Sequence, residues 1–149
     1  MISVEKIKEP GEHIKYFDIE NFYVGTKRPL SLNSAQRLKI ISNGYQIKYD
    51  NKVIGLISEI SAKANKYIFL SMSFLNYEYC TSFLNENDVD TIFDFFKTHK
   101  KFAKVYLYIE GYDDNMLDFS HRFQLIQKGK LNQNTFKANR YYDSYIYEK

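Results

Sequence analysis

FAKVYLYIEGYDDNMLDFSHRFQLIQKGKLNQNTFKANRYYDSYIYEK, residues 102–149, is the stretch that decides the fold. Its apolar pattern predicts three strands, at residues 104–110, 123–131 and 141–148. The first is apolar at nearly every position, which is typical of a strand covered on both faces. An irregular or short helical segment around residues 113–115 separates the first two strands. The last two are joined by a polar loop and should pair as an antiparallel hairpin.

The composition of the whole chain indicates a single globular domain, residues 1–149. Hydrophobic residues make up 44% and charged residues 26%, which excludes a disordered chain. Fourteen Tyr and twelve Phe stand beside no Trp, so many aromatic rings with a polar tip are available to line a core or a cleft. The net charge of +3 is too mild to indicate nucleic-acid binding.

Cys80 is the single cysteine, so no disulfide can form within the chain and we expect a cytoplasmic protein. A nucleophilic Cys80 would need a nearby base, and the three histidines are scattered along the sequence. A small buried thiol is the alternative interpretation. No apolar N-terminal stretch resembles a signal peptide and no run approaches membrane-spanning length, so we expect no membrane partner.

The remaining sequence predicts a series of strands and helices that precede this stretch. In order they are strand 13–20, helix 34–42, a hairpin of strands 45–49 and 53–61, strand 67–75, a loop at 76–85 and helix 86–101. Asn85 or Asn87 can cap the last helix, acids fill its first turn and lysines its last. The crossover through this helix should make strands 67–75 and 104–110 parallel neighbours. We therefore predict an α/β (α+β) fold, a mostly antiparallel, twisted mixed sheet with one parallel pair and helices on both faces.

Three stretches in this order carry a resemblance. They are YQIKYDNKVIGLISEIS at 45–61, RPLSLNSAQRLKII at 28–41, and FQLIQKGKL followed by YYDSYIY within 123–147. They resemble segments of the GNAT superfamily of acyl-CoA-dependent N-acetyltransferases, in particular those acting on ribosomal proteins, polyamines and nucleotide sugars. The resemblance covers about residues 16–149. It implies a GNAT-like fold, acetyl-CoA as co-substrate, and transfer of an acetyl group to a primary amine of a small molecule or peptide.

One segment departs from the family pattern. Family members carry a Gly-rich loop before the long helix, and its backbone N–H groups hold the CoA diphosphate at the helix N-terminus. Here the loop reads NYEYCTSFLN, and no Lys or Arg lies between Lys66 and Lys97. The helix itself begins with Glu86, Asp88 and Asp90, which stabilise its N-terminus and repel a diphosphate placed there.

The resemblance also gives candidates for cofactor contacts. Met72, Ser73 and Phe74 match the strand that lines a gap where pantetheine adds itself as an extra strand, although they fit an ordinary strand equally well. Thr81 and Ser82 fall in the segment that matches the diphosphate loop.

Two residues are the catalytic candidates. Glu59 is an acid within an apolar strand, where burial would raise its pKa and suit it to accept a proton from the attacking amine. A solvent-facing Glu on an alternating strand is the other interpretation. The family's acid, a Tyr, aligns with Asp118 or Phe119, neither of which is a phenol, and Tyr112 is the remaining candidate.

Two polar or aromatic clusters have simpler explanations. The acids around 113–118 could hold a metal or a cationic amine, but no ligand set is complete and we predict no metal site. The tyrosines of 141–147 are typical of hairpin packing. Two functions remain open: an N-acetyltransferase, or a catalytically degenerate GNAT-like domain that acts as a binding or interaction module and forms a homodimer through the aromatic hairpin.

Overall fold

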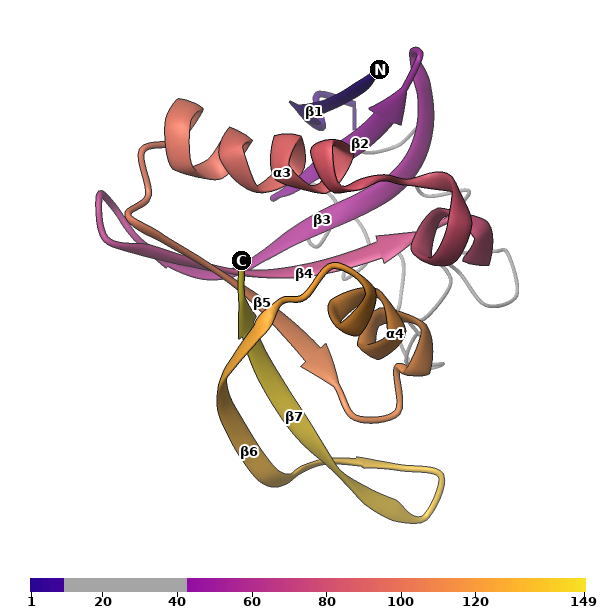
Figure 1. The fold of residues 1–149 in the computed structure, drawn as a ribbon. Coiled ribbons are helices and arrows are strands. Elements are labelled where there is room, and N and C mark those ends of the chain that lie inside the picture. Colours follow the sequence, from indigo (N-terminus) through magenta and orange to yellow (C-terminus); the bar gives the residue numbers. More distant parts are fainter. Residues whose placement is uncertain (10–42) are drawn as a thin grey trace.

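The computed structural model describes residues 1–9 and 43–149 (Figure 1). Its strands and α-helices are β1 (Ile2–Lys6), β2 (Gly44–Tyr49), β3 (Lys52–Lys63), β4 (Tyr67–Phe74), α3 (Glu86–Asp94), β5 (Lys104–Glu110), α4 (Asp114–Arg122), β6 (Ile126–Lys137) and β7 (Arg140–Glu148). Two π-helical turns, Tyr79–Phe83 and Phe95–His99, stand before and after α3.

The described strands form one seven-stranded sheet in the order β1-β2-β3-β4-β5-β7-β6. Strands β4 and β5 are parallel, and every other neighbouring pair is antiparallel. The predicted mixed sheet with one parallel pair, made by the crossover through α3, is therefore confirmed. Figure 1 shows the sheet twisting so that the β6–β7 hairpin projects away from α3.

Two tight turns set the register of the β2–β3 and β6–β7 hairpins. Asp50 and Asn51 join β2 to β3 with φ of 46° and 67°, and Ala138 and Asn139 join β6 to β7 with φ of 51° and 60°. Two consecutive positive φ values fit a turn whose twist matches that of the flanking strands. Asp and Asn tolerate this conformation, which explains why the first hairpin is readable from the sequence.

Helices α3 and α4 cover the same face of the sheet. Tyr45 contacts Phe95 and Phe96 at the end of α3, and Phe74 packs on Phe119 of α4. The ladder partners of Tyr45 and Phe74 on β3 are Ile57 and Gly55, which are two positions apart and project from one face. Predicted helix 34–42 and predicted strand 13–20 both lie outside the described residues.

Several predicted boundaries were wrong. The first described strand is β1, in a segment for which we predicted no strand; Ile2 and Val4 are buried at alternate positions. The loop predicted at 76–85 is largely helical. Strand β6 starts at Ile126 and not at Phe123, because α4 is a full helix and Phe123 is buried behind its end.

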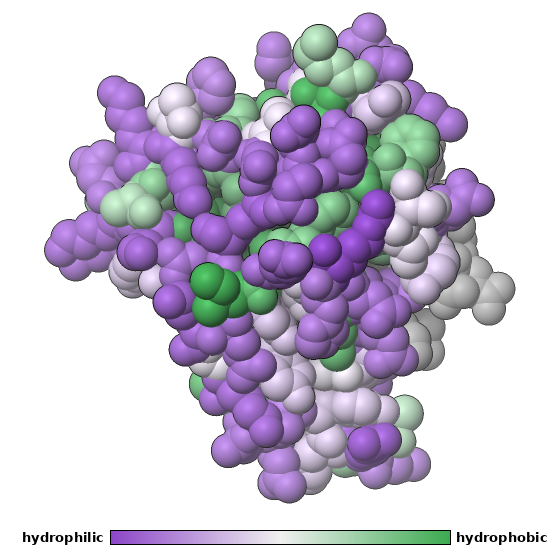
Figure 2. All heavy atoms as spheres, viewed as in Figure 1, coloured by the Kyte–Doolittle hydropathy of each residue, from purple (hydrophilic) through white to green (hydrophobic). Residues whose placement is uncertain are grey.

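The surface differs in polarity between α3 and β7. In Figure 2 the surface over α3 and along β6 is largely hydrophilic, whereas the surface over β7 is paler, as expected where tyrosines are frequent. None of the helices in the described part of the chain combines the length and apolar character needed to cross a bilayer.

Candidate functional site

The parallel strands β4 and β5 pair over only part of their length. Their ladder runs from Tyr67 and Lys104 to Leu70 and Leu107 and stops there. Strand β4 continues to Phe74 paired with β3 alone, and β5 continues to Glu110 paired with β7 alone. Beyond Leu70 and Leu107, each strand therefore presents one backbone edge toward the other without ladder bonds, and these edges form a gap between two parallel strands.

The cofactor candidates on β4 lie beside this gap. Met72, Ser73 and Phe74 all follow Leu70 and are buried, at 2%, 6% and 0% exposure. The Phe74 ring lies 5.6 Å from that of Phe119. Gly55 on β3 permits this packing, since a Cβ there would lie 2.9 Å from the Phe74 ring and 2.8 Å from the Ser73 carbonyl oxygen. The contact of these three residues with pantetheine stays a prediction.

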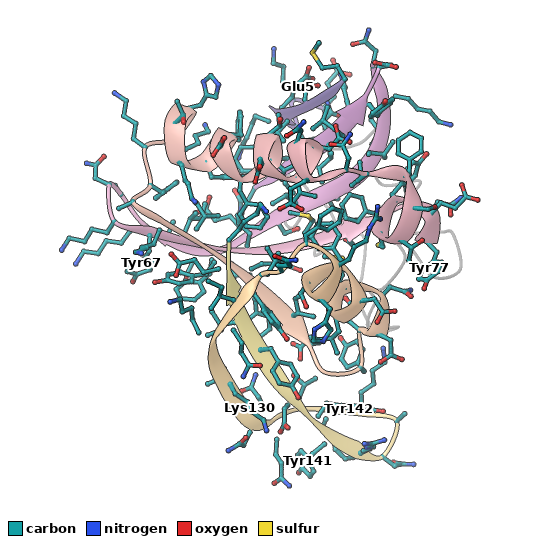
Figure 3. The ribbon with its side chains drawn as sticks, in the orientation of Figure 1. Glu5, Tyr67, Tyr77, Lys130, Tyr141 and Tyr142 are labelled. Carbon is teal, nitrogen blue, oxygen red and sulfur yellow. The ribbon has the colours of Figure 1, made fainter. Side chains whose placement is uncertain are left out.

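A polar cleft of about 500 Å³ opens where β5 ends against the β6–β7 hairpin. It is lined by Gly111, Tyr112, Asp114, Gln133, Arg140, Tyr141, Tyr142, Asp143 and Tyr145. Figure 3 shows Tyr141, Tyr142 and Lys130 on the hairpin, at the end of the molecule that lies away from α3. Four tyrosine rings and two carboxylates thus meet around one opening.

The ring faces in this cleft already attract cations. The Lys137 ammonium lies 4.0 Å from the centre of the Tyr112 ring, and the Arg140 guanidinium lies 4.9 Å from that of Tyr142. The two tyrosines contact each other edge to face, with ring centres 5.6 Å apart. A cation above an aromatic face is stabilised by the ring quadrupole, so Lys137 and Arg140 stabilise this arrangement and occupy the two ring faces.

Tyr112 is half-buried in this cleft and is a weak acid. Burial, followed by the charges of Glu110 and Asp113, raises the pKa of Tyr112 to about 12. The phenol is therefore protonated at neutral pH and can donate a hydrogen bond. Complete proton transfer to a thiolate is uphill, because an ordinary thiol has a pKa of about 8.5.

A polar network between β5 and the β6–β7 hairpin was not predicted from the sequence. Glu110 accepts hydrogen bonds from Thr135 (2.7 Å) and from the buried Ser144 (2.8 Å). Asn134 donates to Tyr108 (2.7 Å) and to Ser144 (3.2 Å). The alternation of polar residues on β5 and β7 was the available signal, but three strands must pair before the network exists.

The predicted acidic turn is a helix start. Asp113 is buried and caps α4 by accepting a hydrogen bond from the Met116 N–H at 3.1 Å. Asp114 lines the cleft, while Asp118 is exposed on α4. Within residues 1–9 and 43–149, no three His, Cys, Asp or Glu side chains come together as a metal-binding group.

Glu59 is exposed, so the burial on which we based its raised pKa is absent. Its position is nevertheless close to the gap. Glu59 is the ladder partner of Leu70, the last β4 residue paired with β5. Burial raises the pKa of Tyr45 and the charge of Glu59 raises it further, which places that carboxylate on the α3 face of the sheet.

The segment that matches the diphosphate loop is a π-helical turn tied to α4. Thr81 is half-buried and its hydroxyl donates to the Tyr77 carbonyl at 3.3 Å, while Ser82 is exposed. Arg122 at the end of α4 donates to the Leu84 carbonyl at 2.7 Å and to the Cys80 carbonyl at 3.4 Å. Thr81 and Ser82 therefore lie in helical backbone, whereas the family's diphosphate segment is an open Gly-rich loop.

Cys80 lies inside this turn as a buried thiol. Burial, together with the charges of Asp113 and Asp118, raises the pKa of Cys80 to about 12. The thiolate that a nucleophile requires is therefore scarce at neutral pH.

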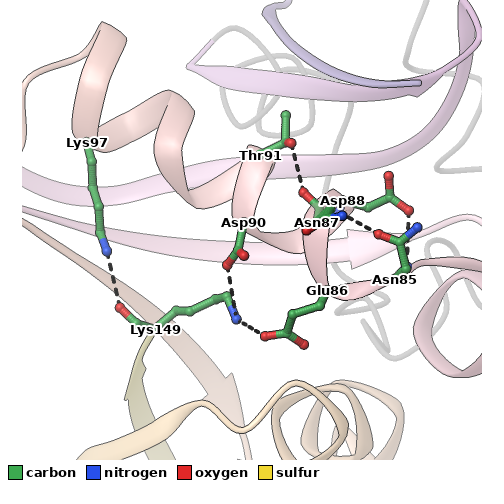
Figure 4. A network of polar contacts seen from close by, with 8 residues as sticks. All are labelled: Asn85, Glu86, Asn87, Asp88, Asp90, Thr91, Lys97 and Lys149. Carbon is green, nitrogen blue, oxygen red and sulfur yellow. Dashed lines mark hydrogen bonds and ion pairs between the residues drawn. The ribbon is translucent and has the colours of Figure 1, made fainter.

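The start of α3 is closed by its own side chains (Figure 4). Asn85 accepts from the Asp88 N–H at 3.0 Å, and the Asp88 carboxylate accepts from the Asn85 N–H at 3.0 Å. This reciprocal pair is a capping box, which confirms Asn85 as the N-cap.

Lys149, which follows β7, also contacts the start of α3. Its ammonium bridges Glu86 and Asp90, the latter at 3.2 Å, and Lys97 donates to the Lys149 carbonyl at 3.2 Å (Figure 4). Burial alone would lower the pKa of Lys149, but the hydrogen bonds to Glu86 and Asp90 outweigh it and the pKa is raised. The positive end of the helix is thus occupied by carboxylates, which are themselves bound by a lysine.

Only the pantetheine half of the CoA that the resemblance implies fits this site. The separated edges of β4 and β5 suit a chain of amides that pairs with them as a strand. The start of α3 does not suit a diphosphate, because Asp88 and Asn85 use each other's N–H groups and the nearby side chains are acids. Residues 67–96 contain no Lys or Arg that could offset these charges.

Structural comparison finds the same fold in known acetyltransferases. RimL, a ribosomal L7/L12 α-N-protein acetyltransferase solved in complex with coenzyme A, superposes with a TM-score of 0.75 at 10% identity over 99% of this chain and 93% of RimL. A mutant form of the spermidine/spermine N-acetyltransferase SpeG from Vibrio cholerae gives 0.69 at 15% identity over 100% and 94%. A GNAT-family acetyltransferase from Bacillus anthracis gives 0.68 at 10% identity over 99% and 93%.

Sequence comparisons add nothing to this, since no protein-family model and no curated protein matches the chain. The likeness therefore concerns the fold. The sheet order, the parallel pair that separates after Leu70 and Leu107, and the superposition over nearly the whole chain agree. This chain has the GNAT N-acetyltransferase fold, as the resemblance of its sequence implied.

Proposed function

We propose that this protein is an N-acetyltransferase that moves an acetyl group from acetyl-CoA to a primary amine of a small molecule or peptide. The observation that carries the proposal is the separation of β4 and β5 beyond Leu70 and Leu107. It leaves two parallel backbone edges facing each other at the centre of a GNAT-fold sheet, where a pantetheine arm could pair as an extra strand.

The protein's part in this reaction is positioning and proton transfer. Acetyl-CoA, when bound, supplies the activated acyl group. Backbone N–H groups of β4 beyond Leu70, in the segment with Met72, Ser73 and Phe74, would orient and polarise a carbonyl in the gap. Glu59, beside the last paired residue of β4, would accept the proton of the attacking amine, and Tyr112 would act as a hydrogen-bond donor that stays protonated.

The acceptor amine would enter through the cleft at the end of β5. Lys137 and Arg140 occupy the ring faces of Tyr112 and Tyr142, and Asp114 adds an exposed carboxylate. That carboxylate favours a positively charged acceptor, which would displace a cation of the chain to reach a ring face. The single cysteine and mild net charge support a cytoplasmic enzyme without a nucleic-acid partner.

Calorimetry and an acetylation assay test the proposal together. Purified protein should release or take up heat with acetyl-CoA at up to millimolar concentration, and should acetylate members of a panel of polyamines, amino sugars and peptides. Product identified by mass spectrometry, in amounts that grow with enzyme concentration, would support the proposal. Neither heat nor product at millimolar acetyl-CoA would reject it.

A second candidate is a GNAT-like domain that binds a partner without catalysis. The observation that favours it is the closed start of α3, where the capping box and Lys149 occupy the region expected to hold a diphosphate. This candidate predicts that the folded protein binds neither acetyl-CoA nor CoA and forms a homodimer or another complex. CoA that copurifies with the protein would count against it.

A further inference from the structure

We infer that the donor site recognises the pantetheine thioester arm alone, and that the nucleotide half of acetyl-CoA contributes little to its recognition. The inference rests on the proposed function and concerns the specificity of the same site. It predicts that an acetyl thioester of pantetheine without any nucleotide is a donor nearly as good as acetyl-CoA. The observations behind it are the charges, the N–H bonds and the lysine at the start of α3.

The charges at the start of α3 oppose a diphosphate. Glu86 and Asp88 occupy the first turn, where the partial positive charge of the helix would otherwise attract phosphate, and Asp90 follows them. A negative group that approached this turn would be repelled by these three carboxylates. The acids therefore take the place that phosphate oxygens would need.

Three hydrogen-bond donors at the start of α3 are also in use. The Asp88 N–H bonds to the Asn85 side chain, and the Val89 N–H bonds to the Asn85 carbonyl at 3.2 Å. The Asn85 N–H bonds to the Asp88 carboxylate. A diphosphate could reach these groups only after the capping box had opened, and a helix without its cap is less stable.

Among the residues that the structure describes, the side chains of Lys149 and Arg122 are bound to other partners. Lys149 is bound by Glu86 and Asp90, and its side chain is only 16% exposed. Arg122 donates its guanidinium hydrogens to the carbonyls of Leu84 and Cys80. Either side chain would have to leave its present partners to bind a phosphate.

The gap itself supplies what the pantetheine arm requires. An arm with two amide groups can exchange N–H and C=O bonds with the strand edges beyond Leu70 and Leu107, as a peptide does when it adds to a sheet. These bonds need only backbone, so they do not depend on the Gly-rich loop that the sequence lacks. Recognition of the donor is thus expected to reside in β4 and β5.

The test compares two donors and three competitors on the full-length protein. The donors are acetyl-CoA and S-acetylpantetheine, with kcat/KM measured for the same amine. The competitors are CoA, pantetheine and 3′-phosphoadenosine 5′-diphosphate, the nucleotide half alone, with their dissociation constants measured by calorimetry. We expect the two donors to agree within about tenfold, the two thiols to bind with similar affinity, and the nucleotide half to show no binding at millimolar concentration.

The outcomes separate this inference from the proposed function. Transfer from acetyl-CoA that exceeds transfer from S-acetylpantetheine by about a thousandfold or more, or tight binding of the nucleotide half, would overturn the inference and leave the acetyltransferase intact. No binding and no transfer with either donor would instead reject the proposed function, and the inference with it.

A pair of variants adds a test of the charges themselves. Glu86→Gln combined with Asp90→Asn removes two acids and releases Lys149, so the preference for acetyl-CoA over S-acetylpantetheine should rise by about tenfold. The matched control is Asp94→Asn at the other end of α3, which should leave the preference unchanged. A double variant whose preference equals that of the control would show that these acids do not decide donor choice.

Discussion

The start of α3 and the end of β5 have opposite characters. At the start of α3, a capping box joins Asn85 to Asp88, and Lys149 binds Glu86 and Asp90. At the end of β5, tyrosine faces and exposed polar groups surround a cleft of about 500 Å³. Figure 2 shows a hydrophilic surface over α3 and a paler one over β7. A sheet of the GNAT fold can thus be open at the end of β5 while ion pairs and a capping box hold the start of α3.

Replacement of a buried ring of α4 should have the largest effect on the stability of the sheet that carries both regions. Phe119 is fully buried and packs on Phe74 of β4 and on Phe123. Phe119→Ala should lower the free energy of unfolding by about 3–5 kcal/mol, because a large core side chain leaves a cavity. Urea unfolding measures this loss.

The control for this variant is Phe136→Ala on the hairpin. Phe136 is 60% exposed, so its loss should change stability by no more than about 0.5 kcal/mol. Equal effects of the two variants would contradict the assignment of Phe119 to the core beneath the gap.

Glu59→Gln tests proton transfer without altering either the start of α3 or the cleft. If Glu59 accepts the proton of the amine, kcat/KM for acetyl transfer should fall by about a hundredfold, the usual contribution of a general base. Its exposed position means that the midpoint of thermal unfolding should hardly change. The control is Glu78→Gln, which replaces another exposed acid. If the Glu59 variant kept the rate of the unmodified protein, Glu59 would have no part in the mechanism.

Gly111→Ala should disturb the cleft and leave α3 intact. The Gly111 N–H donates to the Asp143 carbonyl at 2.8 Å, and a Cβ at Gly111 would lie 2.5 Å from that oxygen. Relief of this clash should cost about 1–3 kcal/mol of stability and raise the KM for the amine more than that for the donor.

The matched control is Gly129→Ala in β6, whose added Cβ would meet the Ile146 side chain at an ordinary 3.4 Å. It should change neither stability nor KM by a measurable amount. A donor KM that rises as much as the amine KM in Gly111→Ala would show that the two regions are not independent.

Lys149→Gln should open the start of α3 with the smallest effect on stability. Its carboxylate partners are about half exposed, so solvent screens the ion pairs and their loss should cost about 0.5–1 kcal/mol at pH 7. Because the folded-state pKa of Lys149 is raised, this stabilisation is complete below the ordinary lysine pKa of 10.5 and is lost as the pH rises through the folded value.

Urea unfolding of the unmodified protein and of the variant at pH 7 and above pH 10.5 measures the difference. The exposed Lys63→Gln serves as the control and should match the unmodified protein. A difference between Lys149→Gln and the unmodified protein that is the same at every pH would contradict a charge-based role.

Local patterns in the sequence predicted a large part of the fold. The Asp50-Asn51 turn, the alternation of β2 and the acids that follow Asn85 each act within a few residues, so a hairpin and a capped helix were readable. β1 was missed because only Ile2 and Val4 mark its buried face. The π-helical turn Tyr79–Phe83 was missed because the loop pattern of the family suggested an open segment.

The site was less predictable because its decisive contacts join distant residues. Lys149 reaches Glu86 across 63 positions, and Arg122 reaches Leu84 across 38. The exposure of Glu59 depends on what covers β3, which its apolar neighbours in the sequence do not reveal. Tyr112 was chosen only as the remaining phenol, and its place in the cleft follows from how β5 meets the hairpin.

Arg122 couples the turn before α3 to α4. Its bonds to Leu84 and Cys80 join this turn, which follows β4, to the end of α4, which follows β5. A movement that separates the two elements would break these bonds, so local opening of the turn depends on the position of α4. Amide hydrogen exchange in Tyr79–Phe83 should therefore report how firmly the turn is held to α4.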